Sequence, residues 1–157
     1  MTEPDEQADP DEQAESEEEA SDLPANDAEQ RSAGQYEDPR SPHDRVLRNI
    51  SAGITRLYNE HFGREPEGVE THFASPNLLI CVLYDSLTPV ERSLRDVGER
   101  QRLRDLRMIL QYSAESQFRA VVETVTGRRV LGFMSGMDVN LDQSCEVFTL
   151  APEADKH

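Results

Sequence analysis

The chain has 157 residues and a formal net charge of −16, from 32 Asp and Glu against 16 Lys and Arg. A chain this acidic is a poor partner for nucleic acid, because phosphate binding requires a basic face. Its longest uninterrupted apolar run, Leu78–Tyr84, is far shorter than the about 20 residues of a membrane-spanning helix, so we expect no direct membrane insertion.

The negative charge is concentrated at the N-terminus. Residues 1–41 carry 15 acidic residues and two basic ones, which leaves 17 acids and 14 bases for the rest of the chain. So polar a segment cannot bury enough apolar surface to offset its chain entropy. We therefore expect a disordered acidic tail over 1–41, one folded domain over 42–152 and a short tail over 153–157. The acidic tail is either solubilising, or it docks on a basic partner or screens a basic patch of its own domain.

The start of the chain has no basic stretch followed by an apolar segment, so we expect no secretory signal and a cytoplasmic location. Both cysteines, Cys81 and Cys145, lie in predicted strands. In a cytoplasmic protein we expect them to be reduced and packed.

The first predicted element is a helix from an N-cap at Asp44 to about His61. Gly63 ends this helix, and Pro66 follows. Apolar residues recur along it at helical spacing, which predicts one buried face, formed by Val46, Leu47, Ile50, Ile54, Leu57 and Tyr58.

A β-hairpin follows the first helix. Residues 69–73 alternate between apolar and polar, and Ser75-Pro76-Asn77 has the composition of a turn. Residues 78–84 are apolar on both sides, which predicts an interior strand with little water on either face.

Two helices are predicted next. Thr88 is an N-cap, Pro89 occupies the first helical position and Glu91 can close a capping box, so a short helix runs to about Val97. After a break at Gly98, a long helix is expected from about Glu99 to Thr126, where Gly127 ends it. Its apolar stripe consists of Leu103, Leu106, Leu110, Ala114, Phe118, Val121, Val122 and Val125.

Two more strands, at 129–135 and about 143–150, are joined by a loop over 136–142. The order α-β-β-α-α-β-β predicts an α+β fold with two layers. Two β-hairpins form a four-stranded, mostly antiparallel sheet, covered by the N-terminal helix and the long central helix. Because such a sheet has open edges and an apolar second strand, we expect a homodimer.

One polar residue lies in the apolar stripe of the long helix. Arg107 falls between Leu103 and Leu110 on the helical wheel, and Arg104 lies at the edge of the stripe. A buried Arg keeps its charge and needs carboxylates, carbonyls or a bound anion. The candidate site is therefore an internal ion pair or a small-anion site formed by Arg107, Arg104, Glu91 and Asp138.

No constellation of catalytic residues is recognisable in the sequence. It lacks GxxxxGK[ST], GxGxxG and GxSxG, and its His and Cys residues have no metal-ligand spacing. Ser144-Cys145 lies in an apolar strand, where packing is the simpler interpretation. We therefore expect no catalytic, cofactor-binding or metal-binding residues.

Residues from about 45 to 151 resemble the MpsC-like domain, named for a sodium-translocating, membrane-potential-generating system. Several segments are similar to family motifs: Phe62-Gly63-Arg64-Glu65-Pro66 to FG-x-GP, Leu87–Leu94 to LTP-x-E, and Thr126–Val130 to TG-x-x-V. The family positions are Gly63, Pro66, Thr88, Pro89, Glu91 and Gly127, with Arg107 matching an arginine of the long helix. Glu65 departs from the motif, which has glycine there.

This resemblance implies a soluble, non-enzymatic accessory or regulatory component, associated with an integral membrane ion-transport protein. The alternative, which rests on the helical wheel alone, is a homodimeric module that binds a small anion around Arg107.

Overall fold

The computed structural model describes residues 41–153, so the expectations for residues 1–40 and 154–157 lie outside the described residues. The elements are α1 (Pro42–Phe62), β1 (Gly68–Ser75), β2 (Leu78–Tyr84), α2 (Pro89–Asp96), α3 (Arg100–Ser113), α4 (Glu115–Thr126), β3 (Val130–Asp138) and β4 (Gln143–Leu150). Among these residues, no helix is both long enough and apolar enough to cross a membrane.

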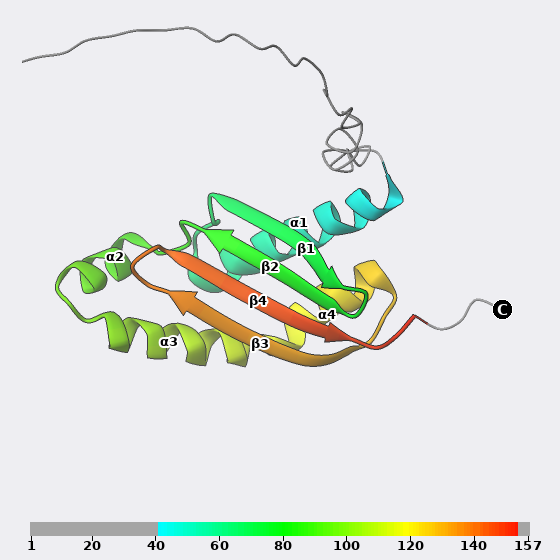
Figure 1. The fold of residues 1–157 in the computed structure, drawn as a ribbon. Coiled ribbons are helices and arrows are strands. Elements are labelled where there is room, and N and C mark those ends of the chain that lie inside the picture. The colour runs from blue at the N-terminus through cyan, green and yellow to red at the C-terminus, as the bar shows by residue number, and fades with distance from the viewer. Residues whose placement is uncertain (1–40, 154–157) are drawn as a thin grey trace, which may run out of the picture. The chain divides into compact units, whose positions relative to one another are not determined.

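The four strands form one antiparallel sheet in the order β1-β2-β4-β3. Each predicted hairpin is present, and pairing of β2 with β4 joins the two hairpins, with Cys81 opposite Glu146. Figure 1 shows α1 and α4 on the same side of this sheet. The predicted α+β class, with a helical layer on an antiparallel sheet, is therefore confirmed.

The N-cap of helix α1 lies three residues before Asp44, the predicted one. Ser41 is the N-cap, its Oγ accepts a hydrogen bond from the backbone N–H of Asp44 at 3.0 Å, and Pro42 occupies the first helical position. The sequence Ser-Pro is thus the true start signal, because proline is pre-organised for the first turn. The helix ends at Gly63, whose φ of 68° is in the left-handed region that glycine adopts without strain.

Helix α2 begins as predicted. Thr88 Oγ1 accepts from the N–H of Glu91 at 3.3 Å, and the Glu91 carboxylate accepts from the N–H of Thr88 at 2.7 Å. This capping box, with Pro89 next to it, ties the first turn of α2 to its own side chains.

The single long helix predicted over residues 99–126 is two helices, α3 and α4, separated at Ala114. The Ser113 hydroxyl donates to the Leu110 carbonyl at 2.7 Å, and the Ala114 N–H reaches the same carbonyl at 3.2 Å. Such competition for one carbonyl bends helices. The Ala114 N–H also contacts the Gln111 carbonyl at 3.1 Å, as in a tighter turn.

The break changes which residues of α3 face the sheet. Leu106 and Leu110, which the straight wheel placed in the buried stripe, are 45% and 37% exposed, whereas Arg107 and Gln111 are fully buried. A single helical wheel drawn over residues 99–126 does not describe both α3 and α4, because the helix is interrupted at Ala114.

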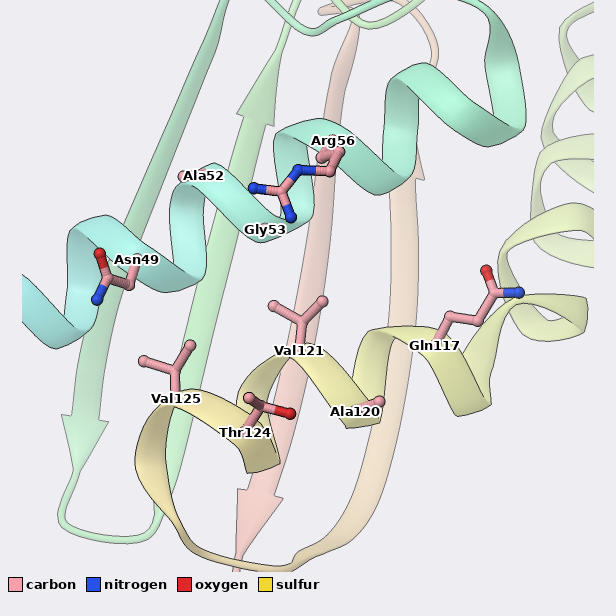
Figure 2. A pocket seen from close by; sticks show the side chains of 9 residues that line it. All are labelled: Asn49, Ala52, Gly53, Arg56, Gln117, Ala120, Val121, Thr124 and Val125. Carbon is pink, nitrogen blue, oxygen red and sulfur yellow. The ribbon is translucent and has the colours of Figure 1, made fainter.

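The apolar core lies between the sheet and helices α1 and α4, where Phe118, Phe133 and Phe148 are neighbours. The two helices approach closely at Gly53, where an added Cβ atom would lie 2.6 Å from Cγ1 of Val121 (Figure 2). A side chain at residue 53 would force the two helices apart, so glycine at this position allows their close packing.

Strand β2 is interior to the sheet, as predicted, but only one of its faces is sealed. Leu79, Cys81 and Leu83 are fully buried against the helices. The alternate residues, such as Ile80 and Val82, are partly exposed. They belong to the other face of the sheet, on which Figure 1 shows neither α1 nor α4. The expectation of little water on either face of β2 is therefore wrong for this second face, because α1 and α4 pack on the opposite face of the sheet.

Candidate functional site

Arg107 is at the centre of the candidate site and is 0% exposed. Its Nε donates to Glu91 Oε1 at 2.6 Å and its Nη2 donates to Glu91 Oε2 at 2.7 Å, which makes a bidentate ion pair. Nη2 also donates to the Ser86 carbonyl at 2.8 Å, and the guanidinium carbon lies 3.9 Å from the centre of the Phe62 ring. One side chain of α3 thus contacts α2, the β2–α2 loop and the last residue of α1.

Glu91 is held in its ionised form by this arrangement. Burial by itself would raise its pKa, but hydrogen bonds from Arg107 and from the Thr88 backbone outweigh burial and hold the pKa below its usual value. The same carboxylate therefore closes the capping box of α2 and neutralises a buried arginine.

A second buried group of polar residues lies on the inner face of the sheet. Ser135 Oγ donates to Gln111 Oε1 at 2.8 Å, Gln111 Nε2 donates to the Tyr58 hydroxyl at 2.7 Å, and that hydroxyl donates to Glu146 Oε1 at 2.7 Å. This chain of hydrogen bonds joins β3, α3, α1 and β4 in turn. We call these four residues the Glu146 network.

Burial raises the pKa of Glu146 to about 7, although the Tyr58 hydrogen bond and the charge of Arg107 act in the opposite direction. Burial and the neighbouring Glu146 also raise the pKa of Tyr58 well above its usual value. Glu146 therefore titrates near neutrality while completely buried.

Asp142, which the sequence analysis did not single out, fastens the β3–β4 turn to the start of α2. Its Oδ1 accepts from the backbone N–H groups of Ser86 and Leu87 at 2.8 and 2.9 Å, and its backbone carbonyl accepts from the Asp85 N–H at 2.9 Å. These partners are more than fifty residues away in the chain, so no local signal could have identified it.

Four buried polar atoms of this region have no hydrogen-bond partner among the described residues. They are Arg107 Nη1, Glu146 Oε2, Ser86 Oγ and Ser144 Oγ.

The structure brings together two of the four predicted site residues. Arg107 and Glu91 are bonded to each other, whereas Arg104 is exposed on α3. Asp138 instead stabilises the β3–β4 turn, where its Oδ1 accepts from the N–H groups of Asn140 and Leu141 at 2.9 and 3.0 Å.

The positions that match family motifs lie at the ends of helices. Gly63 and Gly127 are left-handed C-caps of α1 and α4, with φ of 68° and 67°. Thr88, Pro89 and Glu91 form the first turn of α2, while Pro66 is buried after α1. Each has a structural explanation, and Glu91 also holds Arg107.

A groove of about 560 Å³ lies elsewhere, between α1 and α4 (Figure 2). Small and polar side chains form most of its lining, and Arg56 and Gln117 flank it. Within residues 41–153, no group of three His, Cys, Asp or Glu side chains is placed to hold a metal ion.

Comparison with protein families gives one match. The family described as "Na+-translocating membrane potential-generating system (MpsC)" matches residues 43–152, which include nearly all of the described chain. No curated protein and no solved structure matches the chain.

Replacement of Arg107 by Met is expected to lower the free energy of unfolding by about 3–5 kcal/mol, because it leaves Glu91 buried without its counter-charge. Urea unfolding followed by circular dichroism measures the loss. Arg104→Met is the matched control on the same helix, and its exposed position predicts a change within about 0.5 kcal/mol. Equal effects of the two replacements would contradict a stabilising role of the ion pair.

Glu146→Gln is expected to change how stability depends on pH. Since the pKa of Glu146 is raised in the folded state from 4.5 to about 7, the folded protein binds this proton more tightly than the unfolded chain. Its contribution to stability is greatest at low pH, decreases as pH rises between those two values, and is constant above them. The decrease amounts to about 3 kcal/mol.

The glutamine variant should lack this decrease and should gain stability over the parent protein as pH rises through this window. Urea unfolding at a series of pH values measures the difference. Glu65→Gln, at an exposed position after α1, serves as the control for removal of a surface carboxylate. Parallel profiles for Glu146→Gln and the parent protein would show that Glu146 does not titrate in this window.

Proposed function

We propose that this chain, which belongs to the MpsC family, is a non-enzymatic accessory or regulatory component of a membrane system that translocates sodium ions. The observation that carries the proposal is the extent of the family match, from residue 43 to residue 152, which spans both hairpins and all four described helices. The description of the family supplies the association with a sodium-translocating membrane system.

The use of the buried polar residues supports a role that does not involve catalysis. Arg107 and Glu91 neutralise each other inside the domain, and the Tyr58 hydroxyl and the Gln111 amide are bonded within the Glu146 network. Side chains that hold helices and strands together in this way are not presented to a substrate. A component of this kind acts through its surface, as a soluble cytoplasmic protein that contacts an integral membrane partner and a second copy of itself.

Affinity purification from the native host after mild crosslinking tests this function. The full-length chain and residues 42–157 are compared side by side, and cells with the untagged chain provide the control. We expect both forms to recover the same integral membrane transport protein. Loss of that protein from the shorter form alone would make the acidic segment the docking element, and failure of both forms to enrich any integral membrane protein would refute the association.

A second candidate function, binding of a small anion at Arg107, is favoured by one specific observation. Nη1 of Arg107 is a buried donor without a hydrogen-bond partner among the described residues. Glu91 already balances the charge of the guanidinium, so an anion here would be held by a hydrogen bond and not by a net positive charge.

Thermal denaturation in the presence of phosphate, sulfate, chloride, acetate and small dicarboxylates tests this second function. A bound anion at a hundred times its dissociation constant should stabilise the protein by about 2.7 kcal/mol. Arg107→Lys, which keeps the charge but loses the fork of donors, should abolish the response. An equal melting temperature in all of these anions would rule out the site.

A further inference from the structure

The sheet has an uncovered apolar face. The side chains that point away from the helices on the two central strands are largely apolar, and we call this surface the outer sheet face. Its members are Leu78, Ile80, Val82 and Tyr84 of β2, Gln143, Cys145, Val147 and Thr149 of β4, and Met134 and Gly136 of β3. An antiparallel sheet that faces water on one side normally carries polar residues there.

The strand register makes the apolar part of the outer sheet face continuous. Ile80 lies opposite Val147, which in turn lies opposite Met134. Met134 is 58% exposed and projects from the edge strand β3. A contiguous apolar surface of this kind is typical of a contact with another molecule.

Charged side chains on this side of the sheet lie at its edges, and Asp138 at the end of β3 is in register with Gln143. Glu70 and His72 are exposed on β1, the edge strand opposite to β3, with 3.8 Å between His72 Nε2 and Glu70 Oε2. The centre of the face carries no charged side chain. In a symmetric contact each residue occurs twice, so a charge at the centre would face a like charge. Because the centre of this face is uncharged, two copies could meet there without such repulsion.

The outer sheet face also has both a projection and a hollow. A hollow of about 340 Å³ is lined in part by Val82, Gly136 and Cys145, with the charged Asp138 also in its lining. It lies beside the projecting side chain of Met134, two residues away on the same strand. A surface that carries both features side by side is suited to contact with a copy of itself.

The whole side of the sheet away from the helices, with the edge strand β1 included, reaches the smallest area of a specific dimer. Four strands of seven to nine residues form the sheet. At about 3.3 Å per residue and about 4.8 Å between strands, the face measures roughly 500 Å² before side-chain relief is counted. Two such faces contribute roughly 1,000 Å², which reaches the lower limit for specific protein interfaces.

We propose that two copies of this chain associate through their outer sheet faces and form a four-layer dimer, with helices outside and the two sheets packed against each other. Met134 of each copy occupies the hollow beside Gly136 of the other. This inference rests on the homodimer that forms part of the proposed function, and it names the surface that makes it. Association with a membrane partner is a separate property, tested by purification from the host.

Sedimentation equilibrium of the full-length chain, over a range of concentrations, tests the proposal. The parent protein should be a dimer, and Val82→Lys and Val147→Lys should weaken dimerisation by at least about a hundredfold, because each places two like charges in a closed interface. Ile109→Lys is the matched control, since Ile109 is an apolar residue of α3 that is 67% exposed on the helical side. It should leave the dimer unchanged.

Gly136→Val provides a variant without added charge. A Cβ atom at this position meets no heavy atom of the chain within 4 Å, so the replacement should preserve the fold while it fills the hollow. It should also weaken the dimer.

The two cysteines give an independent readout of both folding and association. Cys145 is partly exposed on the outer sheet face, whereas Cys81 is buried on the inner one. In the parent protein, alkylation of Cys145 should slow as protein concentration rises, and in Val147→Lys its rate should not depend on concentration. Alkylation of Cys81 would reveal a variant that has unfolded.

Two results would overturn the proposal. A parent protein that is monomeric at every concentration would assign the outer sheet face to a different occupant. A dimer that survives the folded Val82→Lys and Val147→Lys variants would place the contact on another surface. Neither result alters the recovery of a membrane protein from the host, so the two proposals fail separately.

Discussion

The buried ion pair of Arg107 and Glu91 is the interaction on which the helical layer depends. A guanidinium that keeps its charge inside a protein is tolerated only where a carboxylate and further acceptors surround it. Here the carboxylate belongs to the capping box that starts α2, and the second acceptor is the Ser86 carbonyl of the β2–α2 loop. One residue of α3 is therefore bonded to both the first turn of α2 and the loop that leaves the sheet.

The inner face of the sheet is divided along the strands into an apolar part and a polar part. Leu79, Phe133 and Phe148 belong to the core cluster beneath α1 and α4. Toward the other end of the same strands, Ser135 and Glu146 are bonded into the network that includes Gln111 of α3. The break at Ala114 coincides with this division: α4 presents an apolar stripe to the apolar part, and α3 presents Arg107 and Gln111 to the polar part.

This division bears on function. The polar side chains that could support chemistry are used to hold the helices, the β2–α2 loop and the strands together, and Asp142 adds the β3–β4 turn to the same assembly. Two surface features are available for contact with other molecules: a groove between α1 and α4, and an apolar sheet face that no described helix covers. Such a domain is suited to binding other proteins, in agreement with the accessory role proposed from its family.

The sequence by itself determined the features that depend on a few neighbouring residues. Thr88, Pro89 and Glu91 predicted the start of α2, Gly63 and Gly127 predicted helix ends, and residues 78–84 predicted an interior strand, because capping and strand patterns act within about four residues. Arg107 was recognisable as an anomaly because charge is rare on an apolar stripe. Three local signals were missed: the Ser-Pro start of α1, Ser113 at the break between α3 and α4, and Asp138, which caps its own turn.

The tertiary structure alone decided the contacts between distant residues. Tyr58 meets Glu146 across 88 positions of the chain, and Gln111 meets Tyr58 across 53. The sequence offered two carboxylates, Glu91 and Asp138, as partners of Arg107, and the packing of α2 against α3 selected Glu91. The uncovered side of β2 was equally out of reach, since it depends on which elements pack together, and local patterns carry no information about that choice.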